Sequence, residues 1–298
     1  MGRSLKLGRL FGIGIYVHWT FLLLPAAVLW MNLGNGLAMA VYAVGLVLAM
    51  FGCVLLHELG HALTARYYGI GTRDITLLPI GGVARLERMS EKPWEEFWIA
   101  VAGPAVNVVI AGVLSVVLLL VGVFLDIGRL GNLVTVNPEV LDWPWWEQAL
   151  LSLLVTNLFL VIFNLLPAFP MDGGRVLRAL LAMFLGRLPA TELAAAVGRF
   201  VAAAMIIFPI FQALVAGVFN PILSLIGLFV LFAGRQELAA VRHQAYVRQA
   251  PPIDVLPLEP LFRDRLPPPE PGFSGFSWNP QAHVWIVWRN GRPVSICR

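Results

Sequence analysis

The sequence predicts an all-α polytopic membrane protein with about six transmembrane helices, a re-entrant β segment and a small C-terminal β-hairpin. Of its 298 residues, 59% are hydrophobic and only 13% are charged, whereas soluble domains carry about 25% charged residues. A chain this apolar needs lipid as its solvent, so the lipid bilayer is an expected partner. Its Lys and Arg residues gather at the ends of apolar runs, as the positive-inside rule requires.

Six apolar runs are long enough to cross about 30 Å of hydrocarbon at about 1.5 Å per residue. They lie at residues 14–31, 37–66, 95–125, 147–167, 191–216 and 219–242. Basic residues follow the second, fourth and sixth runs, whereas loop 126–146 has one arginine against three acids. We therefore expect a multi-pass protein of the cell membrane with both termini in the cytoplasm.

Residues 72–86 are too short and too broken by Pro79, Gly81 and Gly82 to form a helix, and they predict two short strands. This segment is either a plain cytoplasmic connector or a re-entrant hairpin. In the second case its free edge could pair with an extended substrate.

The composition divides the chain into a transmembrane domain at 1–243, a Pro-rich linker at 244–272 and a hairpin tail at 273–298. Eight prolines in 251–271 predict a stiff linker. Residues 283–288 and 293–297 flank Asn290-Gly291, a typical hairpin turn. Two strands alone are marginal in water, so the tail should pack on the membrane domain or on a second copy. Self-association into a homo-oligomer stays open.

The net charge of +4 does not indicate nucleic acid as a partner, because the basic residues form no polar, aromatic-rich face. Cys53 and Cys297 are too few and too far apart to indicate a disulfide framework or a cysteine metal cluster. The basic N-terminus leads into an apolar stretch without a convincing cleavage site, and we interpret that stretch as a retained first helix.

The strongest chemical signal is the run His57-Glu58-Leu59-Gly60-His61. Histidines at i and i+4 lie on one helix face, so both imidazoles can reach one zinc ion. The glutamate after the first histidine then lies where it can move a proton. An ionisable residue in a membrane helix indicates function by default. The competing interpretation is a pair of packing histidines bonded to carbonyl oxygens.

Catalytic zinc needs a third protein ligand and an open position. Asp172 is the best candidate, because it follows the fourth apolar run where Pro167 and Pro170 break the helix. Gly173 and Gly174 then allow a close backbone turn. The alternative is that Asp172 only caps the helix that begins at Gly173.

These motifs together resemble the site-2 protease family of intramembrane zinc metalloproteases, peptidase family M50. The resemblance covers roughly residues 10–240 and rests on HELGH and on NLLPAFPMDGGR at 164–175. The segments 102–107 and 79–86 are also similar to the family's glycine-proline-asparagine and re-entrant strand regions. Many relatives carry a CBS pair or a PDZ domain; the sequence shows neither in full, so a regulatory ligand is in doubt.

The resemblance implies one Zn2+ per chain, held by His57, His61 and Asp172, with Glu58 as catalytic acid and base. It also implies that Asn164 donates to the developing oxyanion or positions the substrate, although a packing role is equally compatible with the sequence. Asn107 is interpreted as structural rather than catalytic.

We therefore expect an endopeptidase that cuts in or near the transmembrane segment of single-span membrane proteins, as in regulated intramembrane proteolysis. Two other functions use the same ligands. A zinc transporter or sensor would need further exchange sites, and a catalytically silent binder of membrane segments would not need the intact HELGH and Asp172.

Overall fold

The computed structural model describes residues 4–123, 144–217, 221–249, 255–257, 270, 272–280 and 283–297. Most of the predicted loop 126–146 and most of the Pro-rich linker lie outside these residues. The chain forms two compact units, Met1–Arg242 and His243–Arg298.

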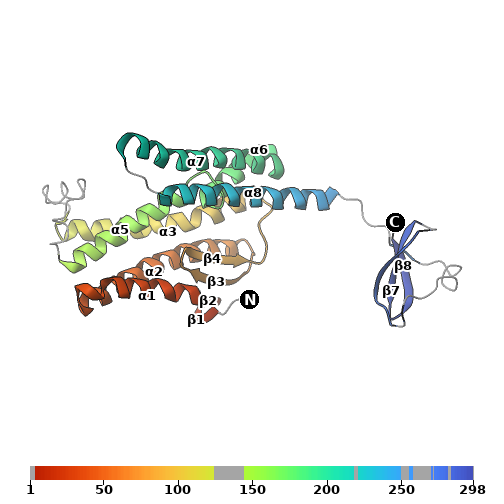
Figure 1. Ribbon diagram of the computed structural model, residues 1–298, viewed down its shortest axis with the longest axis horizontal. Helices are drawn as coiled ribbons and strands as arrows, with labels where there is room; N and C mark the ends of the chain where they lie inside the picture. Colours follow the sequence, from red (N-terminus) through yellow and green to blue (C-terminus); the bar gives the residue numbers. More distant parts are fainter. Residues whose placement is uncertain are drawn as a thin grey trace. The chain divides into compact units, whose positions relative to one another are not determined.

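The first unit is mostly helical, with one small sheet at the end of α2 (Figure 1). Its elements are β1 (Ser4–Leu10), β2 (Ile13–His18), η1 (Trp19–Leu22), α1 (Leu23–Asn32), η2 (Leu33–Asn35), α2 (Leu37–Tyr67), β3 (Thr72–Leu78), β4 (Gly81–Leu86), α3 (Pro93–Leu120), α5 (Trp145–Asn164), α6 (Asp172–Leu185) and α7 (Arg187–Ala216). Helix α8 (Pro221–Gln249) starts in this unit and continues into the second.

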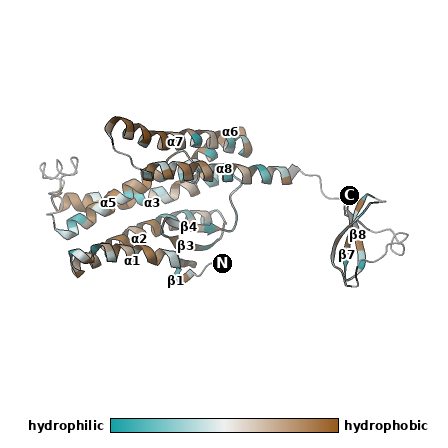
Figure 2. Ribbon diagram, viewed as in Figure 1, coloured by the Kyte–Doolittle hydropathy of each residue, from teal (hydrophilic) through white to brown (hydrophobic). Residues whose placement is uncertain are grey.

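Five helices within the described residues are long and apolar enough to cross a membrane: α2, α3, α5, α7 and α8. Hydrophobic residues cover most of their length in Figure 2. Many large apolar side chains on them are exposed, including Val109, Ile162 and Leu214. Such surfaces require lipid, so the prediction of a multi-pass membrane protein is confirmed.

The first predicted helix, at 14–31, is only partly right. Residues 13–18 form strand β2 and residues 19–22 a 3-10 turn, and α1 then has only ten residues. In β2 the side chains of Ile13, Ile15 and Val17 are buried at every second position, which is the strand period. An apolar run with period two carries the same hydropathy as a helix, so hydropathy alone did not separate them.

The predicted strand pair at 72–86 is confirmed as β3 and β4, which pair antiparallel. They belong to a four-stranded sheet of order β1-β2-β3-β4, in which β2 and β3 run parallel. Ile13 of β2 and Ile75 of β3 pack on Leu59 of α2. This core fixes the sheet against the helix that carries the HELGH motif and leaves β4 as an edge strand.

Helix α3 occupies the centre of the helical packing, because it contacts α2, α5 and α6. It lies beside α5 in Figure 1. Helix α6, which corresponds to the helix expected after Asp172, packs on both α3 and α7. Through α3, residues of α2 and α6 that are far apart in the sequence come together.

The second unit contains a four-stranded antiparallel sheet of order β5-β8-β7-β6. Its strands are β5 (Val255–Pro257), β6 (Gly275–Asn279), β7 (Val284–Arg289) and β8 (Arg292–Cys297). The predicted hairpin is β7 and β8, with Asn290 and Gly291 at positive φ in the turn. Val284, Ile286 and Trp288 form its buried core. The two additional strands supply the packing that a lone hairpin lacks.

Candidate metal centre

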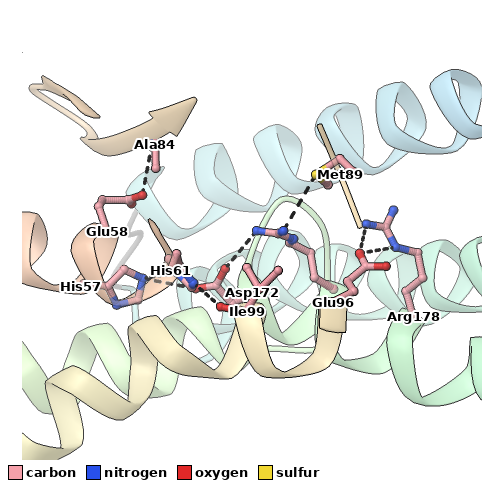
Figure 3. Close-up of polar contacts among 10 residues, drawn as sticks. His57, Glu58, His61, Ala84, Met89, Glu96, Ile99, Asp172 and Arg178 are labelled. Carbon is pink, nitrogen blue, oxygen red and sulfur yellow. Dashed lines mark hydrogen bonds and ion pairs between the residues drawn. The ribbon is translucent and has the colours of Figure 1, made fainter. Parts of the chain in front are cut away.

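Two histidines one turn apart on α2 meet a carboxylate from α6. His57 and His61 are 5% and 6% exposed, and their Nε2 atoms lie 3.1 Å apart. Oδ2 of Asp172 lies 3.2 Å from Nε2 of His57 and 3.1 Å from Nε2 of His61. Figure 3 shows the three side chains converging between the two helices. The structure thus brings together all three residues that the sequence suggested as ligands.

The donor set fits a metal ion. Nδ1 of His57 lies 2.7 Å from Oδ1 of Asn107, and Nδ1 of His61 lies 2.6 Å from the carbonyl oxygen of Ile99. Both partners are acceptors, so both Nδ1 atoms carry a proton and donate it. Neutral rings then present Nε2 lone pairs to the Asp172 carboxylate, and three acceptors around one point need a cation. Two nitrogens and one carboxylate oxygen suit zinc and leave a fourth position open.

Asp172 is presented to the histidines by the start of α6. The helix begins at Asp172 and the residue before it, Met171, makes no side-chain cap bond. Since the Asp172 carboxylate contacts His57 and His61, the structure favours the ligand interpretation over a simple helix cap. An ionised carboxylate at this position is the form that binds a metal.

Because Gly103 has no side chain, the backbone of α3 can lie directly against the two histidines. A Cβ atom there would lie 2.2 Å from Nε2 of His61 and 2.8 Å from Nε2 of His57. Similarly, a Cβ on Gly173 would lie 2.3 Å from the carbonyl oxygens of Leu165 and Leu166. These close approaches bring α3 and the start of α6 against the metal centre.

A chain of buried amides supports His57 from behind. Asn107 accepts from His57 and donates to Oδ1 of Asn157 at 2.9 Å. Asn157 in turn donates to the Leu153 carbonyl oxygen and to Sγ of Cys53. Asn107 and Asn157 are fully buried. The sequence indicated Asn107 only as structural and did not single out Asn157, although a polar residue in an apolar helix is a signal in itself.

Glu58 lies beside the centre, under the tip of the β3–β4 hairpin. Its Oε2 accepts the backbone N–H of Ala84 at 3.2 Å, as Figure 3 shows. A Cβ on Gly82 would lie 2.6 Å from Cγ of Glu58, so the hairpin touches the glutamate side chain. The edge strand β4 and the metal centre therefore meet at Glu58.

Asn164 is the last residue of α5 and is half-buried. Seven residues separate it from Asp172 on the connection to α6. Its side chain makes no hydrogen bond to another described residue. Within the described residues, the structure assigns no partner to the Asn164 amide, and its role stays a prediction.

A second polar cluster, which the sequence interpretation missed, lies on α3, α6 and α8. Arg178 of α6 is fully buried and pairs with Glu96 of α3 and Glu237 of α8. Phe169 also contacts it, with its ring centroid 5.1 Å from the guanidinium carbon. The sequence could have indicated this cluster, because it places two acids and one arginine within or beside apolar runs.

The chain is similar to known metalloproteases over most of its length. The profile of peptidase family M50 matches residues 45–208. Zinc metalloprotease MJ0392 of Methanocaldococcus jannaschii is 35% identical over 88% of this chain and 68% of its own length. The putative zinc metalloprotease sll0528 of Synechocystis is 35% identical over 62% of this chain, and Rip3 of Mycobacterium tuberculosis is 29% identical over 87%.

The matched part spans 46% of the Synechocystis protein and 65% of Rip3. Among solved structures, the site-2 protease from Methanocaldococcus jannaschii is 35% identical, with 79% of this chain and 95% of that chain covered and a TM-score of 0.49. Together, the profile match and the 35% identity to MJ0392 place the chain in peptidase family M50, as a zinc metalloprotease.

Proposed function

We propose that the chain is an intramembrane endopeptidase that cuts single-span membrane proteins in or near their transmembrane segment. The observation that carries this proposal is the burial of His57, His61 and Asp172 around one point on a helix apolar enough to span a membrane. His57 and His61 lie ten and six residues before the end of α2 at Tyr67, which corresponds to roughly 9–15 Å from that end.

The residues at this point have distinct roles in hydrolysis. His57, His61 and Asp172 hold the zinc ion. When bound, zinc polarises the scissile carbonyl and lowers the pKa of water. Glu58 takes a proton from the attacking water and passes it to the leaving amine. Asn164 is proposed to donate its amide to the developing oxyanion, and a packing role remains its alternative.

The substrate is proposed to bind as an extended strand along β4. A peptide bond in a helix has its N–H and C=O groups already paired, so the substrate helix must unwind near the cut. The edge of β4 offers backbone groups to an unwound segment. Because the N–H of Ala84 points at Glu58, a strand paired there would run past the catalytic glutamate.

Both termini are proposed to be cytoplasmic. Strand β2 pairs with β3, which brings the start of the helical run 19–35 and the end of α2 to one sheet. That run therefore returns along α2 and serves as a short first crossing, before the five long helices. The arginines at 66, 73, 85 and 88 follow α2 on this side and favour the cytoplasm.

The test compares wild type with Glu58→Gln on a panel of single-span membrane substrates in detergent, with zinc content measured on both. We expect Glu58→Gln to keep its zinc and to lose about 10²–10⁴-fold in cleavage rate, the usual contribution of an acid–base residue. Equal cleavage by both zinc-loaded proteins would disprove the role of Glu58.

The same two proteins test the rival functions. If the protein is a zinc transporter, the Glu58→Gln variant will still carry zinc into liposomes. If it is a silent binder of membrane segments, even the wild type will cut no substrate. Within the described residues only one cluster of three or more metal-binding side chains is present. A transporter needs a second site for exchange, so the protease is favoured.

A further inference from the structure

A cavity of about 540 Å³ lies between the sheet and helices α6 and α8. Ala84 and Arg85 of β4 line one side, and Arg175 of α6 and Glu237 of α8 line the other. Ala84 is also the residue whose backbone N–H reaches Glu58. The cavity therefore begins at the strand edge that the proposed substrate would use.

The acids of this cavity already have partners. Arg85 donates to both carboxylate oxygens of Asp74, at 2.8 Å and 2.6 Å. These bonds to Asp74 raise the pKa of Arg85. Glu237 pairs with the buried Arg178. Neither acid is left to bind an added cation.

Two arginines at the cavity are not matched in this way. Arg175 lies 3.9 Å from Oδ1 of Asp172 and donates only a long contact, also 3.9 Å, to Sδ of Met89. Its Nε is buried and has no hydrogen-bond partner among the described residues. Arg73 is exposed and forms no ion pair within the described part of the chain. With zinc bound, the charge of Asp172 is shared with the metal, and Arg175 is left with still less compensation.

We propose that this cavity receives an acidic side chain of the substrate, an Asp or Glu, and that Arg175 binds its carboxylate with support from Arg73. A guanidinium offers two parallel donors that match a carboxylate, and Arg175 lines the cavity with no ionic partner closer than 3.9 Å among the residues that the structure describes. The inference rests on the proposed function, because it assumes a substrate strand paired with β4.

The geometry of a strand restricts where the acid lies. Same-face side chains on a strand recur about every 6.6 Å, twice the rise per residue. From Ala84, beside Glu58, the cavity extends past Leu86 to Met89. The acid is therefore expected two to four residues from the cleaved bond, and acid scanning on both sides of that bond will locate it.

The cleavage test uses pairs of single-span substrates that differ only in Glu or Gln at each scanned position. Wild type should cut the Glu substrate about tenfold faster in kcat/KM at one position, the order expected for one charge-assisted hydrogen bond. Arg175→Gln should bring this ratio close to one, Arg175→Lys should keep part of it, and Arg73→Gln should reduce it less. Arg199→Gln, at an exposed arginine of α7, is the matched control and should keep the full ratio.

A binding test separates this inference from the proposed function. The affinity of the Glu and Gln peptides is measured by fluorescence anisotropy on Glu58→Gln, alone and combined with Arg175→Gln or Arg73→Gln. Preference for Glu that depends on these arginines supports the inference even if wild type cuts nothing, a result that would remove only the protease function. No preference at any position, or a preference that survives both arginine changes, overturns it. Zinc content is measured for every variant. If Arg175→Gln loses its metal, the preference for Glu over Gln peptides is judged from the Arg73→Gln variant alone.

Discussion

At the scale of single residues, the metal centre depends on how its histidines are held from behind. His57 donates Nδ1–H to Asn107, and His61 donates to a main-chain carbonyl oxygen. Only the first of these two partners is a side chain, so only that partner can be removed by substitution. Asn107 is therefore a positioning residue, which acts on the metal through His57.

Replacing Asn107 with Leu should weaken zinc binding by about 10–100-fold, as is typical when the partner of a metal-bound histidine is lost. The reason is that the His57 ring loses both its fixed tautomer and its orientation. Zinc affinity would be measured by competition with a chelator. Asn107→Asp keeps an acceptor for Nδ1–H and should bind zinc more tightly than the Leu variant. Identical affinities for Leu and Asn at this position would remove the proposed positioning role.

Gly103→Ala should expel the metal without unfolding the helix. The new methyl group would lie 2.2 Å from Nε2 of His61, so the ring would have to move, and zinc affinity should fall at least about tenfold. Gly112→Ala on the same helix is the control, because a Cβ there meets nothing within 4 Å. If both variants retained zinc equally, the close approach of α3 would be unimportant for the site.

The sequence was sufficient to predict the site residues whose positions depend only on their neighbours along the chain. The four-residue spacing of His57 and His61 places both side chains on one helix face through the helical period alone. Asp172 was recognisable because it follows a broken apolar run. The contact between His57 and Asn107 bridges 50 positions, and it depends on how α2 packs on α3. No spacing rule contains that information.

At the scale of elements, the apolar helices were predictable and the start of the chain was not. The expected runs at 37–66, 147–167 and 191–216 correspond closely to α2, α5 and α7. Strand β2 was taken for helix because its partner, β3, lies sixty residues further along the chain. Helix α6 was not among the predicted membrane crossings because, at 14 residues, it is too short to span a bilayer.

The buried ion cluster that joins α3, α6 and α8 should stabilise the fold strongly. Arg178→Met removes the cation between the buried Glu96 and the partly exposed Glu237, which leaves a buried carboxylate unpaired and should cost about 3–5 kcal/mol. Thermal unfolding in detergent would measure the loss as a lower Tm. Arg242→Met breaks the exposed pair with Glu192 and should cost at most about 1 kcal/mol. Comparable shifts in Tm for the two variants would contradict this expectation.

At the scale of the whole molecule, the metal joins parts of the chain that are far apart. His57 lies on α2 and Asp172 on α6, and 115 positions separate them. A ligand that binds only the folded state stabilises it, by about 4 kcal/mol when the free metal exceeds its Kd a thousandfold. Zinc is therefore expected to fasten α6 to α2 as well as to serve the reaction.

Removing zinc with a chelator should lower the Tm of wild type and should expose the 165–171 connection to limited proteolysis. Asp172→Ala, which lacks one end of the link, should show little further change on chelation. Both readings are independent of protease activity. An unchanged Tm for wild type after complete loss of zinc would mean that the helices hold together without the metal.

The long separation between the ligands also has a consequence during synthesis of the protein. When α2 enters the membrane, the histidines and Glu58 are in place, but the carboxylate from α6 has not yet been made. The site is completed only after α3 and α5 have been inserted and α6 has docked against them. A growing chain therefore lacks a complete metal site until α6 has been made, because the order of its own residues delays the arrival of its last ligand.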